Sequence, residues 1–197
     1  MSLKRLATAT RKTRETDITA TLDIDGRGES RIDTGLPFLD HMLELLAKHA
    51  LIDLRLRARG DLQVDYHHTV EDVGLVMGSV LDQALGDRKG IGRYGWSYVP
   101  MDDALARAVV DLGGRPYLVF KMAHRQKKIV TFDLGLIREF LQAFTVQARM
   151  NLHVEQFYGQ DAHHAYEAAS KALARALRMA CARDPRQRGI PSSKGRI

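Results

Sequence analysis

Two stretches of this 197-residue chain share one pattern: "HALIDLRL" at residues 49–56 and "QARMNLHV" at residues 147–154. A shift of 98 residues aligns Ala50 with Ala148 and Leu54 with Leu152. Upstream of these stretches, the same shift brings His41 opposite Glu139. Self-similarity at a fixed offset is the mark of an internal repeat, so we interpret the chain as one structural unit present twice.

The pattern of apolar residues around the repeat predicts the fold class. Alternation predicts strands at residues 16–25, 51–60 and 150–158, and two strands within 104–122 joined by the turn "DLGGRP". Helical spacing predicts helices at residues 38–49, 67–85, 134–148 and 163–182. We therefore predict an α/β fold (α+β, two-layer) built from a duplicated strand–strand–helix–strand–helix unit. Residues 1–197 should form a single catalytic domain whose halves, about 1–92 and 93–197, share one core with the sheets covered by helices.

Composition limits the class of protein. Hydrophobic residues make up 45% of the chain and charged residues 27%, as in ordinary soluble globular domains. No apolar run reaches the roughly 18–20 residues of a membrane span. The single cysteine, Cys181, excludes an internal disulfide framework, and together these features predict a cytoplasmic protein. Part of the net charge of +6 lies in a basic tail at residues 184–197, which is either solvated or a site for a phosphorylated ligand or nucleic acid.

Paired histidines begin two of the predicted helices, in "DYHHTVEDVG" (residues 65–74) and "DAHHAYEAAS" (residues 161–170). Because residues four apart share a helix face, His67 and Glu71 can hold one ion. His68 lies about 100° around the helix from His67, so we expect the two rings to serve different metals or different subunits. The second motif repeats this arrangement with His163, His164 and Glu167.

The preceding helix of each half adds one polar residue to the set of candidate metal ligands. Imidazole and carboxylate ligands without a thiolate favour Mn, Fe, Zn, Co or Ni over Ca or Mg. We leave His49, His124 and His153 outside the site. The candidate metal ligands are His41, His67, His68, Glu71, Glu139, His163, His164 and Glu167.

Several long motifs resemble those of the imidazoleglycerol-phosphate dehydratases of histidine biosynthesis, in the same order and over nearly the whole chain. They are "GLPFLDHML", "DYHHTVEDVGL", "GIGRYG", "DLGGRPYLVF", "DAHHAYEAASKALARALR" and "GIPSSKG". The resemblance implies a lyase with two Mn²⁺ ions per active site, held by His41, His67, His68, Glu71, His163, His164 and Glu167. It departs at Glu139, where many family members have histidine; we keep Glu139 as a ligand because the repeat places it opposite His41.

The resemblance also implies the substrate contacts and the assembly. Family members form a hollow homo-24-mer with active sites between subunits, and no nucleic acid or membrane partner is expected. The basic tail would then help to bind the substrate phosphate. The residues that match family substrate contacts are Glu15, Arg93, Arg115, Ser192, Ser193 and Lys194.

The implied reaction is dehydration of imidazole glycerol phosphate to imidazole acetol phosphate. No carbonyl adjoins the C–H bond that must break, so the proton is not acidic. A metal-bound imidazolate could expel the neighbouring hydroxyl to give a diazafulvene-like intermediate, which acidifies that C–H bond. We predict that Glu15 transfers the proton, because the resemblance places it at the substrate and the other glutamates of the set are assigned to metal.

Two other functions are compatible with the residues alone. A two-metal phosphoester hydrolase could use the same ligands to activate water. An RNA-binding module would explain the basic charge, although aromatic-rich RNA-recognition motifs are absent.

Overall fold

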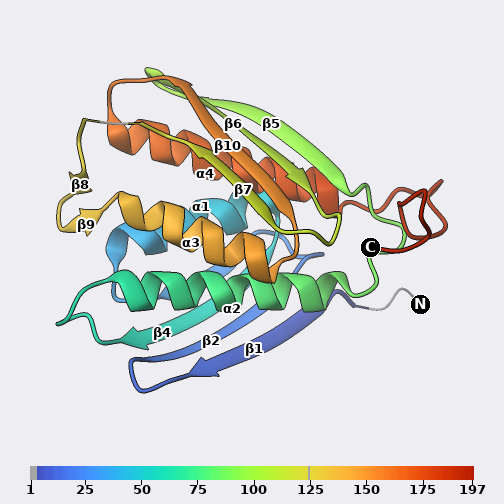
Figure 1. Ribbon diagram of the computed structural model, residues 1–197, viewed down its shortest axis with the longest axis horizontal. Helices are drawn as coiled ribbons and strands as arrows, with labels where there is room; N and C mark the ends of the chain where they lie inside the picture. The colour runs from blue at the N-terminus through green and yellow to red at the C-terminus, as the bar shows by residue number, and fades with distance from the viewer. Residues whose placement is uncertain (1–3, 124) are drawn as a thin grey trace.

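The computed structural model describes residues 4–123 and 125–197, and over these residues the chain forms four helices and two four-stranded sheets (Figure 1). The first half comprises β1 (Leu6–Lys12), β2 (Thr16–Asp23), β3 (Ser30–Asp33), α1 (Pro37–Ala50), β4 (Asp53–Gly60) and α2 (His67–Leu85). The second comprises β5 (Tyr94–Met101), β6 (Ala104–Asp111), β7 (Tyr117–Lys121), a small hairpin of β8 (Lys128–Ile129) and β9 (Phe132–Asp133), α3 (Gly135–Gln147), β10 (Asn151–Tyr158) and α4 (Ala162–Cys181).

The two large sheets have the same strand order. It is β1-β2-β4-β3 in the first half and β5-β6-β10-β7 in the second, with only the last pair of each sheet parallel. The predicted mixed α/β class is confirmed. Each half nevertheless has three strands of its large sheet before its first helix, one more than the predicted unit. The large-sheet strands that the sequence analysis missed, β1, β3 and β5, lie at sheet edges, where a strand buries little and its alternation is weak; the short strands β8 and β9 were missed as well.

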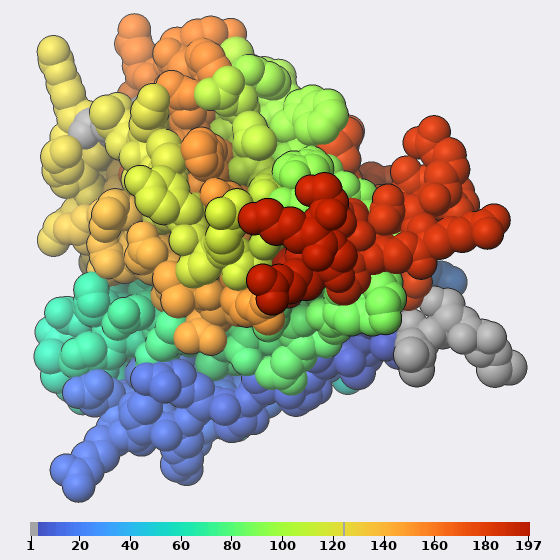
Figure 2. Space-filling model, turned by 45° about the vertical axis from the view of Figure 1, so that its right-hand side comes forward, coloured from blue at the N-terminus to red at the C-terminus, as the bar shows by residue number. Residues whose placement is uncertain are grey.

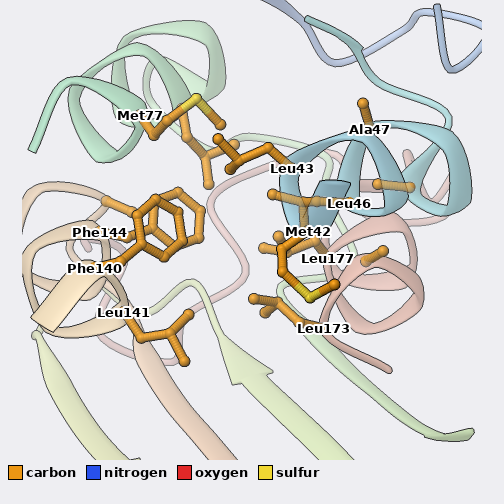
Figure 3. Close-up of a cluster of buried hydrophobic side chains, with 14 of the residues drawn as sticks. Met42, Leu43, Leu46, Ala47, Met77, Phe140, Leu141, Phe144, Leu173 and Leu177 are labelled. Atoms are coloured by element: carbon orange, nitrogen blue, oxygen red, sulfur yellow. The ribbon is translucent and has the colours of Figure 1, made fainter. Parts of the chain in front are cut away.

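The four helices lie between the two sheets (Figure 1). The helix α2 packs on β1 and β2, while α4 packs on β5 and β6; α1 contacts α4, and α3 contacts α2. Their apolar side chains form one core that includes residues of both halves. Figure 3 shows its centre, where Met42 and Leu46 of α1 face Phe140 and Phe144 of α3 across the gap between the helices. The halves therefore share a core, as predicted.

Two glycines set how closely α2 approaches α3. A Cβ atom on Gly74 would lie 2.5 Å from the Phe140 carbonyl oxygen, and one on Gly78 would lie 2.6 Å from the Phe144 carbonyl oxygen. These distances are shorter than van der Waals contact, so any larger residue would push the helices apart. The close approach fixes α2, and with it the histidine pair at its start.

The described helices include none that is long and apolar enough to cross a membrane.

We expect Cys181 to resist thiol reagents in the folded protein. The side chain is 3% exposed, and burial raises the pKa of its thiol to about 12. Since the thiolate is the reactive form, little of it exists at pH 8. Titration with a chromogenic disulfide reagent should detect almost no thiol in native protein and one thiol per chain in denaturant. Rapid labelling of the native protein would contradict this burial.

Candidate active site

Aspartates fix the start of both histidine-bearing helices. Asp65 accepts a hydrogen bond from the His67 backbone N–H at 2.7 Å, and Asp161, the N-cap of α4, accepts one from the His164 N–H at 3.1 Å. Both hydrogen bonds satisfy backbone N–H groups that have no partner within the helix. Each histidine pair is therefore held in the first turn of its helix.

The two rings of each pair are nearly perpendicular. The ring centroids of His67 and His68 are 6.3 Å apart with an interplanar angle of 85°, and those of His163 and His164 are 6.5 Å apart at 83°. Neighbouring rings therefore point in different directions, and the two motifs reproduce the same geometry. This is the arrangement that would let one pair serve two ions.

Three predicted ligands come together from two helices: His41 of α1, and His163 and Glu167 of α4. Their ligand atoms all lie within 4.8 Å of one another. The Glu167 Oε2 atom lies 3.4 Å from His41 Nε2 and 3.3 Å from His163 Nε2. Two imidazoles and one carboxylate converging on a small volume form a suitable set of donors for a transition metal.

A residue that the sequence analysis missed, Lys171, also contacts this group. Its Nζ atom donates a hydrogen bond to Glu167 Oε1 at 2.6 Å. Burial raises the pKa of Glu167, but hydrogen bonds from Lys171 and His41 outweigh it and leave the pKa below its ordinary value. Glu167 is therefore an anion at neutral pH. The spacing of four residues between Glu167 and Lys171 was the available sequence signal.

The equivalent ligands of the first half are more widely spaced. The distance from His67 Nε2 to Glu71 Oε2 is 3.8 Å, across one turn of α2. The Glu139 carboxylate lies 3.2 Å from Arg138 Nη1. Within residues 4–123 and 125–197, no group of three close ligand atoms includes Glu139, His67 or Glu71. The structure thus brings His41 to the second motif but does not gather Glu139 with the first.

We call the second histidine of each pair, His68 and His164, the outer histidine. Two further carboxylates that the sequence analysis missed hold these outer histidines. Asp61 Oδ2 lies 3.1 Å from His68 Nδ1, and Asp103 Oδ1 lies 2.8 Å from His164 Nδ1. These hydrogen bonds raise the pKa of both imidazoles. The candidate proton-transfer residue, Glu15, lies beside them: ligand atoms of Glu15, Asp61 and His68 are within 4.8 Å of one another. The Glu15 Oε2 atom is 3.8 Å from His68 Nδ1.

The histidines left outside the site are placed apart from these groups. His49 lies in the last turn of α1, and His153 is exposed on β10. His124 lies outside the described residues.

Arg93 connects the body of the protein to the basic tail. Its guanidinium donates to both oxygens of Asp111, at 2.7 and 3.2 Å, and to the Pro191 carbonyl oxygen at 2.7 Å. Its backbone is left-handed, with φ of 67°. A non-glycine residue in that region is strained and persists only where the surrounding contacts hold it. Arg93 thus positions the residues that follow Pro191.

The remaining predicted phosphate contacts lie near this arginine. The Arg115 side chain is exposed, and its carbonyl oxygen accepts a hydrogen bond from Asn151. The tail bends back so that Ile197 packs at Gly114, where a Cβ atom would lie 2.7 Å from Ile197. In Figure 2 the dark red tail lies against residues of the green segment of the chain. Arg93 therefore contacts Pro191, and Gly114, next to Arg115, lies at Ile197; these tail residues flank Ser192, Ser193 and Lys194.

The histidines and the tail are at opposite ends of the molecule. The Arg93 N–H bonds to the Ala180 carbonyl oxygen at the end of α4, whereas His163 lies at its start. A rise of 1.5 Å per residue puts His163 and Ala180 roughly 25 Å apart along the helix axis. Figure 1 shows α4 running between these two ends. One copy of the chain therefore does not bring all its predicted site residues together.

A family model for imidazoleglycerol-phosphate dehydratase matches residues 34–177, most of the chain. The chain belongs to the imidazoleglycerol-phosphate dehydratase family. Its relatives of that name include proteins of Methylorubrum extorquens, 50% identical over 98% of this chain and 100% of the relative, and of Pelobacter propionicus, 53% identical over 98% and 99%. The predicted family is thereby confirmed. The chain is a lyase of histidine biosynthesis that acts on a phosphorylated imidazole.

Solved structures of the family have the same fold. The imidazoleglycerol-phosphate dehydratase of Staphylococcus aureus superimposes with a TM-score of 0.83 at 38% identity, covering 91% of this chain and 99% of that one. The Pyrococcus furiosus dehydratase in complex with (S)-C348 also gives 0.83, at 33% identity, covering 96% and 100%.

Proposed function

We propose that this chain dehydrates imidazole glycerol phosphate at sites completed between two copies of itself. The observation that supports this is the separation within one chain, roughly 25 Å, between the histidines and the end of α4 that holds Arg93. A small phosphorylated imidazole cannot contact both ends at once. A second copy that presents its tail to the histidines of the first would complete the site. The family resemblance extends this proposal to a homo-24-mer, in the cytoplasm.

We further propose two Mn²⁺ ions for each site. The donor set fits, since two imidazoles and an anionic Glu167 converge within 4.8 Å. When bound, the ions would supply the positive charge that stabilises the imidazolate form of the substrate ring. The residues assigned to hold them are His41, His67, His68, Glu71, Glu139, His163, His164 and Glu167, with Glu139 included on the repeat alone.

The chain's own residues have two tasks in this mechanism. The carboxylate of Glu15, next to His68, would remove the proton from the substrate carbon nearer the phosphate. Glu15 is suited to it because its backbone is fixed while its side chain remains exposed: the Thr13 hydroxyl accepts from its N–H at 3.0 Å, and its carbonyl oxygen accepts from the Asp61 N–H at 3.1 Å. The tail and Arg115 would bind the phosphate.

We expect truncation before Ser192 to raise KM at least about tenfold while leaving kcat for bound substrate much less affected. Ser192, Ser193 and Lys194 offer hydroxyls and an ammonium to a phosphate, and charge-assisted hydrogen bonds of this kind contribute mainly to binding. Steady-state kinetics over a range of substrate concentrations measures both constants. An unchanged KM would mean that the tail is only a solvated segment.

The decisive experiment measures the metal content, the mass of the native assembly and the reaction product. Elemental analysis should find about two Mn²⁺ per chain, native mass measurement should give a 24-mer, and incubation with imidazole glycerol phosphate should yield imidazole acetol phosphate. Release of free phosphate instead would favour the two-metal hydrolase. A monomeric, fully active protein would contradict sites completed between copies.

A further inference from the structure

The outer histidine of each pair is held in the same way, although the residues that hold it come from different places. His68 Nδ1 faces Asp61, at the end of β4, and His164 Nδ1 faces Asp103, in the turn between β5 and β6. The repeat does not relate these two aspartates, because a shift of 98 places Gly159 opposite Asp61. The two halves thus have the same carboxylate–imidazole contact at non-equivalent positions, which duplication alone does not explain.

The aspartate in the second half is itself held firmly. Asp103 Oδ2 accepts hydrogen bonds from the Gln160 and Asp161 backbone N–H groups, at 2.6 and 3.2 Å, while Oδ1 faces the imidazole. The loop before α4, the turn between β5 and β6, and His164 are therefore tied to one carboxylate. Asp61 is anchored through its own N–H, which donates to the Glu15 carbonyl oxygen at 3.1 Å.

These contacts determine which ring nitrogen is available to a metal. An ionised carboxylate only accepts hydrogen bonds, so the nitrogen facing it must carry the proton. In a neutral imidazole the other nitrogen then has the free lone pair. For His68 and His164 that atom is Nε2. Asp102 lies 3.5 Å from Nε2 of His164, farther than the 2.8 Å hydrogen bond between Asp103 and Nδ1, so the Asp103 contact sets the tautomer.

We propose that Asp61 and Asp103 are positioning residues, which hold Nδ1–H of His68 and His164 so that Nε2 of each ring binds metal. The proposal rests on the metal centre of the proposed function. It adds two residues outside the predicted ligand set, and it fixes the ligand atom of each outer histidine. Carboxylates in this position commonly orient a ligating histidine, and their loss typically lowers metal affinity about 10–100-fold.

Cobalt titration of the metal-depleted, full-length chain tests the proposal without substrate. We expect Asp61→Asn and Asp103→Asn each to weaken Co²⁺ binding about 10–100-fold, measured by competition with a chromophoric chelator. An asparagine can donate its amide N–H to Nδ1, which stabilises the tautomer with Nε2 protonated. The visible absorption per bound Co²⁺ should therefore change as an imidazole leaves the coordination sphere. A purely structural role would not alter that spectrum.

Matched variants show whether the carboxylates of Asp61 and Asp103 are what metal binding requires. Asp61→Glu and Asp103→Glu keep the acceptor and should bind Co²⁺ more tightly than the asparagine variants. Asp87→Asn, which removes an exposed carboxylate beyond the far end of α2, should bind as the wild type does. Thermal unfolding of each metal-free variant should match the metal-free wild type.

Three outcomes would overturn the proposal. Wild-type affinity and spectrum in both asparagine variants would show that neither aspartate positions a ligand. Failure of the metal-free asparagine variants to fold would assign the aspartates a structural role instead. If the wild-type chain itself bound no Co²⁺, the metal centre of the proposed function would fail as well, a result distinct from failure of the positioning role alone.

Discussion

Co-assembly of two inactive variants, Glu167→Gln and Arg115→Ala, should restore activity that neither variant has alone. Glu167 belongs to the histidine end of the chain and Arg115 to the tail end. Each variant alone should lose at least about 100-fold in kcat/KM, as loss of a metal ligand or a phosphate clamp commonly does. In a random 1:1 assembly, half of the histidine ends and half of the tail ends are intact. About a quarter of the sites therefore combine an intact histidine end with an intact tail end.

Co-expression of the two variants with different affinity tags, followed by tandem purification, gives mixed assemblies for assay. The matched control pairs Glu167→Gln with His163→Ala, two changes at the same end of α4, and no recovery is expected from it. Recovery in the first mixture alone identifies a site shared between copies. If both mixtures stay inactive, the site lies within one chain.

Much of the fold could be predicted because its central elements are long and strongly patterned. The helix predicted at residues 67–85 is α2 without change, since its buried valines recur at helical spacing. The predicted strand at residues 51–60 contains β4, whose leucines point inward and whose arginines point outward. By contrast β3 is four residues long and buries none of them, so its sequence carries no alternation to detect.

The site could be predicted only where helical spacing or the internal repeat connects its residues. The spacing of four residues correctly placed Glu167 beside His163, and the repeat identified His41 as the matching polar residue of the preceding helix. The sequence analysis missed Asp61 and Asp103 because each reaches its histidine through tertiary structure, across a loop and across a turn between strands. The distance between the histidine end and the tail end likewise depends on the folded helices, and no local sequence pattern indicates it.

We expect Glu15→Gln to reduce kcat about 100-fold or more while metal content and KM change little. Its carboxylate lies beside His68, with its Oε2 atom 3.8 Å from Nδ1, so it sits at the edge of a metal site without being assigned as a ligand. A glutamine keeps the size and polarity of the side chain but cannot accept the proton. Positioned acid–base groups contribute about 10²–10⁴-fold, which sets the expected loss.

The test of Glu15 depends on separating proton transfer from metal binding. Elemental analysis of the purified variant should show wild-type metal content, and Glu29→Gln, a change at an exposed glutamate in the loop before β3, should keep normal turnover. If Glu15 removes the proton, deuterium at the substrate carbon should slow the wild-type reaction wherever that step limits the rate. Near-normal turnover of Glu15→Gln with full metal content would exclude Glu15 and leave the proton to another carboxylate. Asp102 would be the next candidate, because it is exposed 3.5 Å from Nε2 of His164 at the equivalent turn of the second half.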